Sequence, residues 1–363
     1  MENKFLFCSF YYRSNLKTGA NKRFENIILS LKEYLTNDQK IVVLIKKGNF
    51  SNVFIDKKIE VHEIPIAPIL DRFFTFIMFS MKLLSLNKMI VVSDFMPIPL
   101  MALSKHIHFQ LIHDIRNFTE FKRVDYLSSG QKIQKREWSK CQNILTVSNF
   151  TKKQLMQECG ISKDRIYVSP NGIDANYLDM IPNKARDIDI LYIATFEHRK
   201  NHKLLMEALG NYKGEKKIKV CLIGKDLGTK KEIISKADLL RNNVDVDFID
   251  NINNEKELID HYNRACLFVC PSLYEGFGMP VIEALSRGCI VLCTNIEVFQ
   301  EIGGKNIQYF SPNDSDQLLM LIENSLNKEN KIGIDSQFFE AYKWSKIAKD
   351  LMGLFNQKIN NVK

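Results

Sequence analysis

The sequence lacks an apolar run long enough to cross a lipid bilayer. Its longest apolar stretch, Phe73 to Leu86, is interrupted by Lys82 and is shorter than the roughly 20 residues that a transmembrane helix requires. The opening residues, Met1-Glu-Asn-Lys4, also lack the basic start and long apolar core of a signal peptide. Both absences favour a cytoplasmic protein, and we expect the stretch from Phe73 to Leu86 to be a packed helix rather than an anchor.

The sequence also has little that indicates a zinc site or a redox cofactor. Its eight cysteines lie mostly in apolar, strand-like or helical segments. The pairs Cys266-x3-Cys270 and Cys289-x3-Cys293 fall within or beside apolar strand patterns, whereas structural zinc pairs usually sit on turns at shorter spacing. We therefore expect buried, reduced thiols. A Gly-x-Gly-x-x-Gly fingerprint after a strand is missing as well, which argues against a dinucleotide-dependent oxidoreductase.

Negative charge is the scarcer sign, since 51 lysines and arginines face 42 aspartates and glutamates, a formal net charge of +9. The excess lysines are spread along the chain. Such a balance suits anionic nucleotide substrates or a membrane surface that carries anionic lipid. A generally lysine-rich proteome would produce the same composition, and both explanations stay open. We expect no nucleic-acid partner.

Short apolar segments alternate with helical patterns along most of the chain. Continuous apolar strands between helices predict parallel sheets that are covered on both faces, and 363 residues suffice for about two domains. The fold class is therefore α/β, with two Rossmann-like domains. The expected strands are Lys4–Phe10, Lys40–Ile45, Ile59–Ile64, Lys88–Ser93, His106–Ile112 and Asn143–Ser148 in the first half, and Asp189–Thr195, Lys219–Gly224, Val244–Ile249 and Leu267–Cys270 in the second.

We expect the first domain to span residues 1–178 and the second to span residues 187–340. The polar stretch from Asp179 to Asp187 is the expected linker. Relative motion of the two domains is then the default. Beyond them, Phe338 to Phe355 shows one helical pattern with a single apolar side, formed by Trp344, Ile347, Leu351 and Leu354.

The most informative stretch is Pro271-Ser-Leu-Tyr-Glu-Gly-Phe-Gly-Met-Pro-Val-Ile-Glu-Ala284. It follows an apolar strand, and Pro280 suits the first turn of a helix that should end at Gly288. Gly276 and Gly278 allow main-chain N–H groups to approach a ligand, and the positive end of the helix dipole favours an anion such as a diphosphate.

Two carboxylates, Glu275 and Glu283, bracket this anion site. With its context, the Glu275-x7-Glu283 spacing resembles the signature of the retaining nucleotide-sugar glycosyltransferases of family 4, which have the GT-B architecture. The resemblance implies two Rossmann-like domains that face each other across a cleft, and a C-terminal helix in residues 341–363 that returns to the first domain. It also implies transfer of a hexosyl unit from a nucleoside-diphosphate sugar, with retention of anomeric configuration and with neither metal nor cofactor.

The resemblance assigns roles around the donor. Arg199 and Lys200 match the family's phosphate-binding pair, and their charges at a helix start oppose the helix dipole, which disfavours a purely structural role. Glu283 is implied to hold the ribose hydroxyls. The donor sugar is implied to contact Glu275 and the backbone of the loop, and the residues at the helix start complete the donor site, namely Gly276, Phe277, Gly278 and Met279.

In the first half, His113-Asp114 follows an expected strand, where an imidazole and a carboxylate can orient a sugar hydroxyl. A lone histidine is more often structural, but family members carry a His-Asp pair at this strand end beside the transferred sugar. Gly19 lies where the family has a glycine-rich loop near the donor phosphate or the acceptor. The family often has two adjacent glycines there, whereas this chain has Gly19-Ala20.

The resemblance points to surface-polysaccharide assembly, such as that of lipopolysaccharide. The acceptor would be a glycan or a lipid-linked oligosaccharide, and the enzyme would work in the cytoplasm or in peripheral contact with the cytoplasmic face of the inner membrane. Two alternatives keep the same fold, a non-catalytic nucleotide-sugar-binding protein and a GT-B sugar-nucleotide epimerase.

Overall fold

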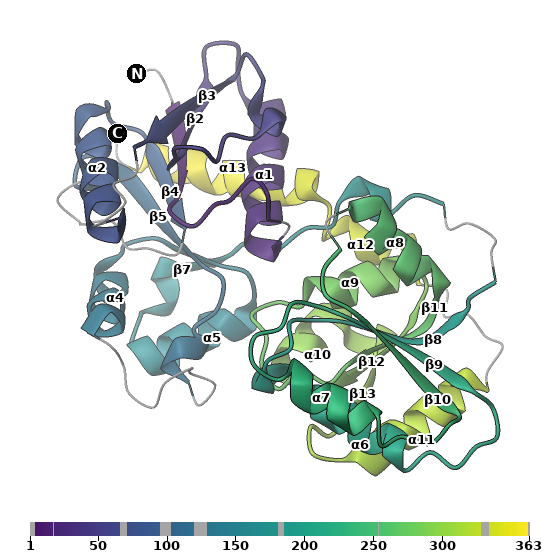
Figure 1. The fold of residues 1–363 in the computed structure, drawn as a ribbon. Coiled ribbons are helices and arrows are strands. Elements are labelled where there is room, and N and C mark those ends of the chain that lie inside the picture. Colours follow the sequence, from purple (N-terminus) through teal and green to yellow (C-terminus); the bar gives the residue numbers. More distant parts are fainter. Residues whose placement is uncertain are drawn as a thin grey trace. The chain divides into compact units, whose positions relative to one another are not determined.

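The computed structural model describes residues 4–16, 18–65, 71–94, 103–119, 129–180, 185–252, 254–327 and 334–361. The chain divides into two compact units. The first unit contains residues 1–172 and 341–363, and the second unit contains residues 173–340. Both units are built from a parallel sheet with helices on its faces (Figure 1), which confirms the α/β prediction.

The first unit has a seven-stranded parallel sheet in the spatial order β3-β2-β1-β4-β5-β6-β7. Near-continuous apolar runs produce these strands, and residues 41–46 of β2 are all buried. The first strand of the chain, β1, lies inside the sheet because it pairs with β2 on one side and with β4 on the other. The strands are β1 (Lys4–Ser9), β2 (Lys40–Lys46), β3 (Ile59–Ile64), β4 (Ile90–Asp94), β5 (Ile107–Ile112), β6 (Ile144–Thr146) and β7 (Ile166–Val168).

Two helices of the first unit begin at a side-chain cap. Thr18 accepts a hydrogen bond from Asn21 N at 3.2 Å and so starts α1 at Gly19, the residue for which the family resemblance implied a glycine-rich loop. The side chain of Ser148 caps α5, which ends at Gly160 with a φ of 63°. The helices are α1 (Gly19–Leu31), α2 (Asp71–Ser85), α4 (Ser129–Lys140), α5 (Asn149–Cys159) and α13 (Trp344–Asn360).

The C-terminal pattern forms two helices, so the prediction of one helical segment from Phe338 to Phe355 is wrong. Helix α12 (Ser336–Glu340) belongs to the second unit, whereas α13 starts at Trp344 after an extended residue, Lys343, with a φ of −68° and a ψ of 130°. Helix α13 packs on the first unit as expected. Its Phe355 ring lies 5.8 Å from that of Phe5 and 5.0 Å from that of Phe109.

The second unit has a six-stranded parallel sheet in the order β10-β9-β8-β11-β12-β13. Its first strand, β8, again lies inside the sheet, between β9 and β11. The strands are β8 (Ile188–Ile193), β9 (Ile218–Ile223), β10 (Val244–Ile249), β11 (Ala265–Cys270), β12 (Ile290–Thr294) and β13 (Gln308–Phe310). The helices are α6 (His202–Gly210), α7 (Lys230–Ala237), α8 (Glu255–Arg264), α9 (Met279–Ser286), α10 (Glu297–Gly303), α11 (Ser315–Leu326) and α12.

Both sheets share the order 3-2-1-4-5-6 for their first six strands. Strands 2 and 3 are added on one side of strand 1, and strands 4 to 6 are added on its other side. Ligands of such sheets bind beyond the carboxyl ends of the strands at this switch point. The switch point lies between β1 and β4 in the first unit and between β8 and β11 in the second.

The two units divide between Gly172 and Ile173, before the polar stretch that the sequence indicated as the linker. Residues 173–178 belong to the second unit because they are anchored there. Tyr177 is fully buried, and Arg287 donates hydrogen bonds to the carbonyl oxygens of Tyr177 at 3.1 Å and Asp179 at 2.8 Å.

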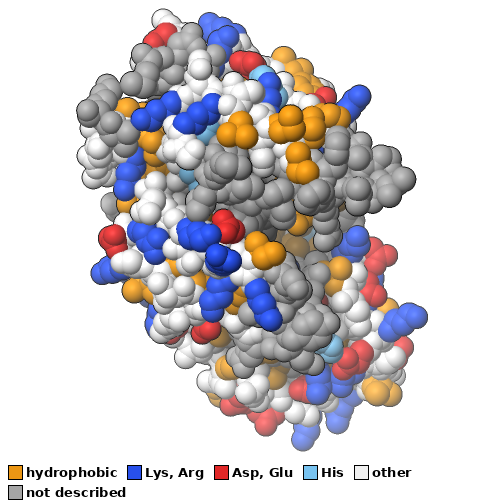
Figure 2. All heavy atoms as spheres, turned by 90° about the vertical axis from the view of Figure 1, so that its left-hand side faces the viewer, with side chains coloured by type: hydrophobic (Ala, Val, Ile, Leu, Met, Phe, Trp, Pro, Cys, Tyr) orange, Lys and Arg blue, Asp and Glu red, His pale blue; other side chains and the backbone are white. Residues whose placement is uncertain are grey.

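The eight cysteines form no disulfide, and all but Cys266 are buried. No helix in the described ranges is long and apolar enough to cross a membrane. On the face drawn in Figure 2, lysine and arginine side chains are interspersed with acidic and apolar ones.

Candidate functional site

Two loops meet at the switch point of the second unit, one after β8 and one after β11. Leu273 N donates to the carbonyl oxygen of Arg199 at 2.7 Å, which joins the two loops directly. The buried Tyr192 joins them a second time, because its hydroxyl donates to Lys200 O at 2.8 Å and lies 3.0 Å from Ser272 Oγ. The backbone around Lys200 is therefore fixed from within the unit.

The side chains of Arg199, Lys200 and Glu275 converge between these loops. Lys200 Nζ forms an ion pair with Glu275 Oε1, and Arg199 Nη1 lies 3.3 Å from Glu275 Oε2. Arg199 also donates to the carbonyl oxygen of Tyr274 at 2.9 Å and pairs with Glu197 at 2.8 Å. All four charged side chains are only 12–14% exposed. The structure thus brings Arg199 and Lys200 into contact with Glu275, which lies 76 and 75 positions further along the chain.

The two cations control the ionisation of Glu275. Burial alone would raise the pKa of this carboxyl group, but the charges of Lys200 and Arg199 and the hydrogen bond from Lys200 outweigh it. The pKa of Glu275 therefore lies below its ordinary value. The carboxylate is negative at neutral pH and keeps both cations in place.

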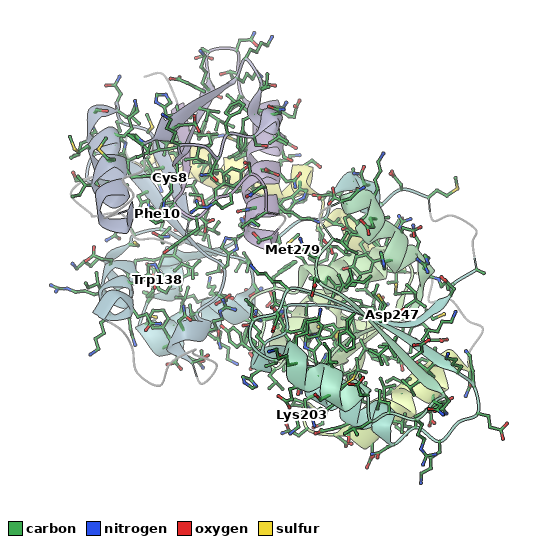
Figure 3. All side chains as sticks on the ribbon, in the orientation of Figure 1. Cys8, Phe10, Trp138, Lys203, Asp247 and Met279 are labelled. Carbon is green, nitrogen blue, oxygen red and sulfur yellow. The ribbon has the colours of Figure 1, made fainter. Side chains whose placement is uncertain are left out.

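The glycine loop leads directly into helix α9, which starts at Met279 (Figure 3). Gly278 has a φ of 103°, and a Cβ there would lie 2.9 Å from Phe299 Cε1, so this position requires glycine. Phe277 is buried, and Pro280 occupies the first turn as predicted. No side chain caps the helix. Pro280 has no N–H, and Val281 N donates to Gly278 O at 3.0 Å, so Met279 supplies the N–H that can serve an anion at the helix start.

Glu283 lies on α9 in a setting unlike that of Glu275. Its side chain is 6% exposed and accepts a hydrogen bond of 2.9 Å from the hydroxyl of Tyr262 on α8. The helix ends after Ser286, and Gly288 has the expected left-handed backbone, with a φ of 69°. The two glutamates therefore differ in partner, one held by cations and the other by a phenol.

In the first unit, His113 follows β5 and pairs with the last residue of the neighbouring strand β4. Its Nε2 lies 3.1 Å from Asp94 Oδ1, and Ser9 Oγ donates to Asp94 Oδ2 at 3.4 Å. Asp114 has a different, local contact, since its Oδ1 accepts from Arg116 N at 3.1 Å. His113 and Asp114 are thus neighbours in sequence whose side chains have separate partners.

Gly19 is exposed at the start of α1, and the same helix carries a buried arginine, Arg23. Arg23 donates to Pro170 O at 2.5 Å and to Ser169 Oγ at 2.8 Å. Burial lowers the pKa of Arg23 to about 10, and the charge of Asp94 acts in the opposite direction. The side chains of Arg23 and Asp94 line a cavity of about 20 Å³, next to the candidate site of the first unit.

Two family models match the chain one after the other. Residues 49–177 match the model "Glycosyltransferase Family 4", and residues 179–334 match the model "Glycosyl transferases group 1". The chain belongs to the family 4-like glycosyltransferases. Its two Rossmann-like units are those of the GT-B architecture.

The chain is similar in sequence to two mannosyltransferases of O-antigen chains. It is 28% identical over 233 residues to the O-antigen chain mannosyltransferase B of Escherichia coli, covering 60% of this chain and 61% of that protein. It is 26% identical over 224 residues to the O-antigen chain mannosyltransferase RfbU of Salmonella typhimurium, covering 59% of each. The matches thus span about three fifths of the length of these curated relatives.

A solved structure extends the likeness in fold to almost the whole chain. Sucrose-phosphate synthase from Thermosynechococcus elongatus aligns with a TM-score of 0.78 at 15% identity. The alignment covers 99% of this chain and 100% of the synthase chain.

The sequence did not indicate several residues that organise the site. Asp94 ends an apolar strand, and a polar residue at that position was the one available signal. Tyr192 and Tyr262 lie within apolar and helical patterns that look like ordinary core. Their hydroxyl partners come from segments distant in sequence, so only the fold reveals them.

Proposed function

We propose that the protein is a retaining hexosyltransferase that moves a sugar from a nucleoside-diphosphate sugar to a glycan or lipid-linked acceptor in surface-polysaccharide synthesis. The convergence of Arg199 and Lys200 on Glu275, beside the loop that opens α9, carries this proposal. The two O-antigen relatives support a mannosyl unit as the transferred hexose.

Breaking the bond between sugar and diphosphate moves negative charge onto the leaving group. Groups that are already oriented toward that charge stabilise the transition state more than the ground state. Arg199 can form a forked contact with phosphate oxygens, and Lys200 supplies a compact charge. The N-terminus of α9 adds the N–H of Met279 and the positive end of the helix dipole.

Glu275 keeps the cation pair ordered until the donor enters. A diphosphate carries more negative charge than one carboxylate, so it can take over Arg199 and Lys200 as its own partners. Glu275, together with the backbone of Gly276, Phe277 and Gly278, is then available to hydroxyl groups of the donor sugar. Glu283 would hold the ribose hydroxyls.

The first unit would supply the groups that hold the transferred sugar and the acceptor. His113, held by Asp94 through Nε2, would orient a hydroxyl of the transferred sugar. Asp114 would support His113 by holding the turn that follows it. Gly19, exposed at the start of α1, would face the donor phosphate or the acceptor.

We expect the reaction to proceed without metal or cofactor and to retain the anomeric configuration. We expect the enzyme to act in the cytoplasm, with peripheral contact to the inner membrane where the acceptor is lipid-linked.

A panel of nucleotide sugars tests the donor class. UDP- and GDP-linked hexoses, GDP-mannose among them, are added in thermal unfolding experiments, because a ligand at 100 times its Kd stabilises the folded state by about 2.7 kcal/mol. At least one donor should raise the Tm of the wild type and not that of Lys200→Ala. Lys203→Ala is the matched control, since Lys203 is exposed on α6 (Figure 3).

Binding alone does not establish transfer, so the donor that binds is then incubated with a lipid-linked glycan. The anomeric proton of the product, followed by NMR, reports the stereochemistry. A product of inverted configuration would contradict the retaining mechanism. No stabilisation by any donor would contradict the proposed function itself.

A further inference from the structure

Tyr262 makes a contact with the candidate donor site that the proposed roles do not use. Its hydroxyl donates to Glu283 Oε2 at 2.9 Å, and the side chain is fully buried in the last turns of α8. Glu283 itself is on α9, so the two groups come from different helices. A helix that does not carry Glu283 therefore fixes one of its carboxylate oxygens.

The phenol ring has little freedom to move. It lies 6.1 Å from the Tyr177 ring in an edge-on arrangement and 5.8 Å from the Phe268 ring of β11. The carbonyl oxygen of Tyr262 also accepts hydrogen bonds from Arg186 Nη1 and Cys289 Sγ, both at 3.3 Å. The hydroxyl is thus presented to Glu283 from a rigid position.

The phenol also stays a donor over the working pH range. Burial, followed by the charge of Glu283, raises the pKa of Tyr262 well above its ordinary value. The proton therefore remains on Tyr262 and occupies one of about four acceptor positions of the carboxylate. A carboxylate accepts hydrogen bonds, which suits it to a vicinal diol such as that of ribose.

A hydrogen bond from a rigid donor restricts the rotation of a buried carboxylate and helps to solvate it. We propose that Tyr262 is a positioning residue that orients the carboxylate of Glu283 toward the ribose hydroxyls of the donor nucleotide. This inference rests on the proposed function, in which Glu283 binds the ribose.

The test compares Tyr262→Phe, Glu283→Gln and the double variant in the full-length protein. UDP and GDP are titrated by calorimetry, and the nucleotide that binds more tightly is compared with its 2′,3′-dideoxy analogue. Tyr262→Phe keeps the ring packing and removes only the hydroxyl. Tyr212→Phe is the matched control, because Tyr212 is also buried in the second unit and its hydroxyl donates to Lys216 O at 3.0 Å.

We expect Tyr262→Phe to weaken binding of the ribonucleotide about tenfold, a factor that corresponds to roughly 1.4 kcal/mol. Binding of the dideoxy analogue, which has no hydroxyls for Glu283, should not change. In the Glu283→Gln background, the loss of the Tyr262 hydroxyl should have no further effect. In kinetics with the whole donor, KM should rise with kcat nearly unchanged.

Three other results would overturn the inference in distinguishable ways. Equal weakening of the ribonucleotide and its analogue would mean that Tyr262 acts only on the fold. A ribose-specific effect of Glu283→Gln without one of Tyr262→Phe would leave the proposed function intact and reject the role of Tyr262. A Glu283→Gln protein with unchanged ribonucleotide binding would reject the role of Glu283, and the inference with it.

Tyr262→Phe could fold poorly because it removes a hydrogen bond from a buried carboxylate. The double variant keeps the test valid in that case, since an amide carries no charge to solvate. If the double variant folds and binds the ribonucleotide as well as the wild type does, neither side chain contributes to ribose binding and the inference is wrong.

Discussion

Charged groups at the carboxyl edges of the two sheets are arranged in different ways. In the second unit, Arg199 and Lys200 share the carboxylate of Glu275, so opposite charges are concentrated at one point. In the first unit, the buried Arg23 donates to neutral oxygens, and Asp94 pairs with an imidazole. Both edges lie at the switch point of a sheet with the same strand order.

The difference shows that the shared fold determines where a ligand binds, at the switch point of each sheet. The side chains at that edge determine which kind of ligand group can bind there. A cluster with two cations can exchange its internal carboxylate for a diphosphate. A His-Asp pair offers no two permanent cations to a diphosphate and is suited to hydrogen bonds with neutral hydroxyl groups. If this division holds, substitutions in the two units should affect nucleotide binding and turnover in different proportions.

Loss of the Lys200 ammonium should have the largest effect. Removing one preorganised group that stabilises charge in the transition state typically lowers kcat by roughly 100- to 1,000-fold. Lys200→Ala should show a loss of this size and weaker binding of the nucleoside diphosphate, measured by steady-state kinetics and calorimetry. Lys203→Ala, on the exposed side of α6, is the control. A folded Lys200→Ala enzyme with normal kinetics would contradict the assignment of diphosphate stabilisation to the cation pair of the second unit.

Substitution of His113 should affect turnover and leave nucleotide binding alone. His113→Asn removes one hydrogen bond to the transferred sugar, and we expect kcat to fall about tenfold. The affinity for the nucleoside diphosphate should not change, because the imidazole belongs to the other unit. His62→Asn, a partly exposed site on β3, controls for the loss of an imidazole. Parallel losses of nucleotide affinity in His113→Asn and Lys200→Ala would break the proposed division.

Much of this architecture could be predicted from the sequence because buried parallel strands are near-continuous apolar runs. The strand from Val244 to Ile249 was predicted at its observed bounds, and Gly288 ends α9 as expected. The C-terminal helices could not be separated. Phe338 to Phe355 keeps a helical pattern across the break at Lys343, and the chain turns there so that Trp344 packs on Gly172.

The candidate site was only partly predictable for a related reason. Local patterns indicated Arg199, Lys200 and Glu275 separately, each as the end of a strand or the start of a helix. Their contact depends on β8 pairing with β11, and no local pattern specifies that pairing. The same limit hid Asp94, whose partner His113 lies 19 residues away, directly after the next strand.

His202, beside the cation pair of the second unit, can be compared with His113 of the first unit. Unlike His113, it forms no ion pair with a carboxylate among the described residues. Its ring is 4.4 Å from the Phe196 ring and 4.6 Å from the Tyr192 ring, and it is 2% exposed. Neither ring nitrogen has a hydrogen-bond partner among the described residues. Burial, followed by the charge of Lys200, lowers the pKa of His202 to about 3.

The sign of the resulting pH dependence follows from proton binding. The folded protein keeps His202 neutral down to pH 3, whereas the unfolded chain takes up a proton below a pH of about 6.5. The contribution of His202 to the stability of the folded state is therefore fully present above the pKa that it has in the unfolded chain. This contribution is lost as the pH falls toward the pKa that it has in the folded protein. Between pH 6.5 and 5.5 this one group should reduce the free energy of unfolding by about 1 kcal/mol.

His202→Leu should remove this share of the acid sensitivity. The measurement is the difference in unfolding free energy between pH 6.5 and 5.5, from denaturant titrations followed by circular dichroism. The slope with pH is the quantity to compare, because the change in packing shifts stability equally at both pH values. His198→Leu, an exposed position four residues away, is the control for removing an imidazole. Equal flattening in both variants, or none in His202→Leu, would contradict the assignment of a neutral, buried imidazole behind Lys200.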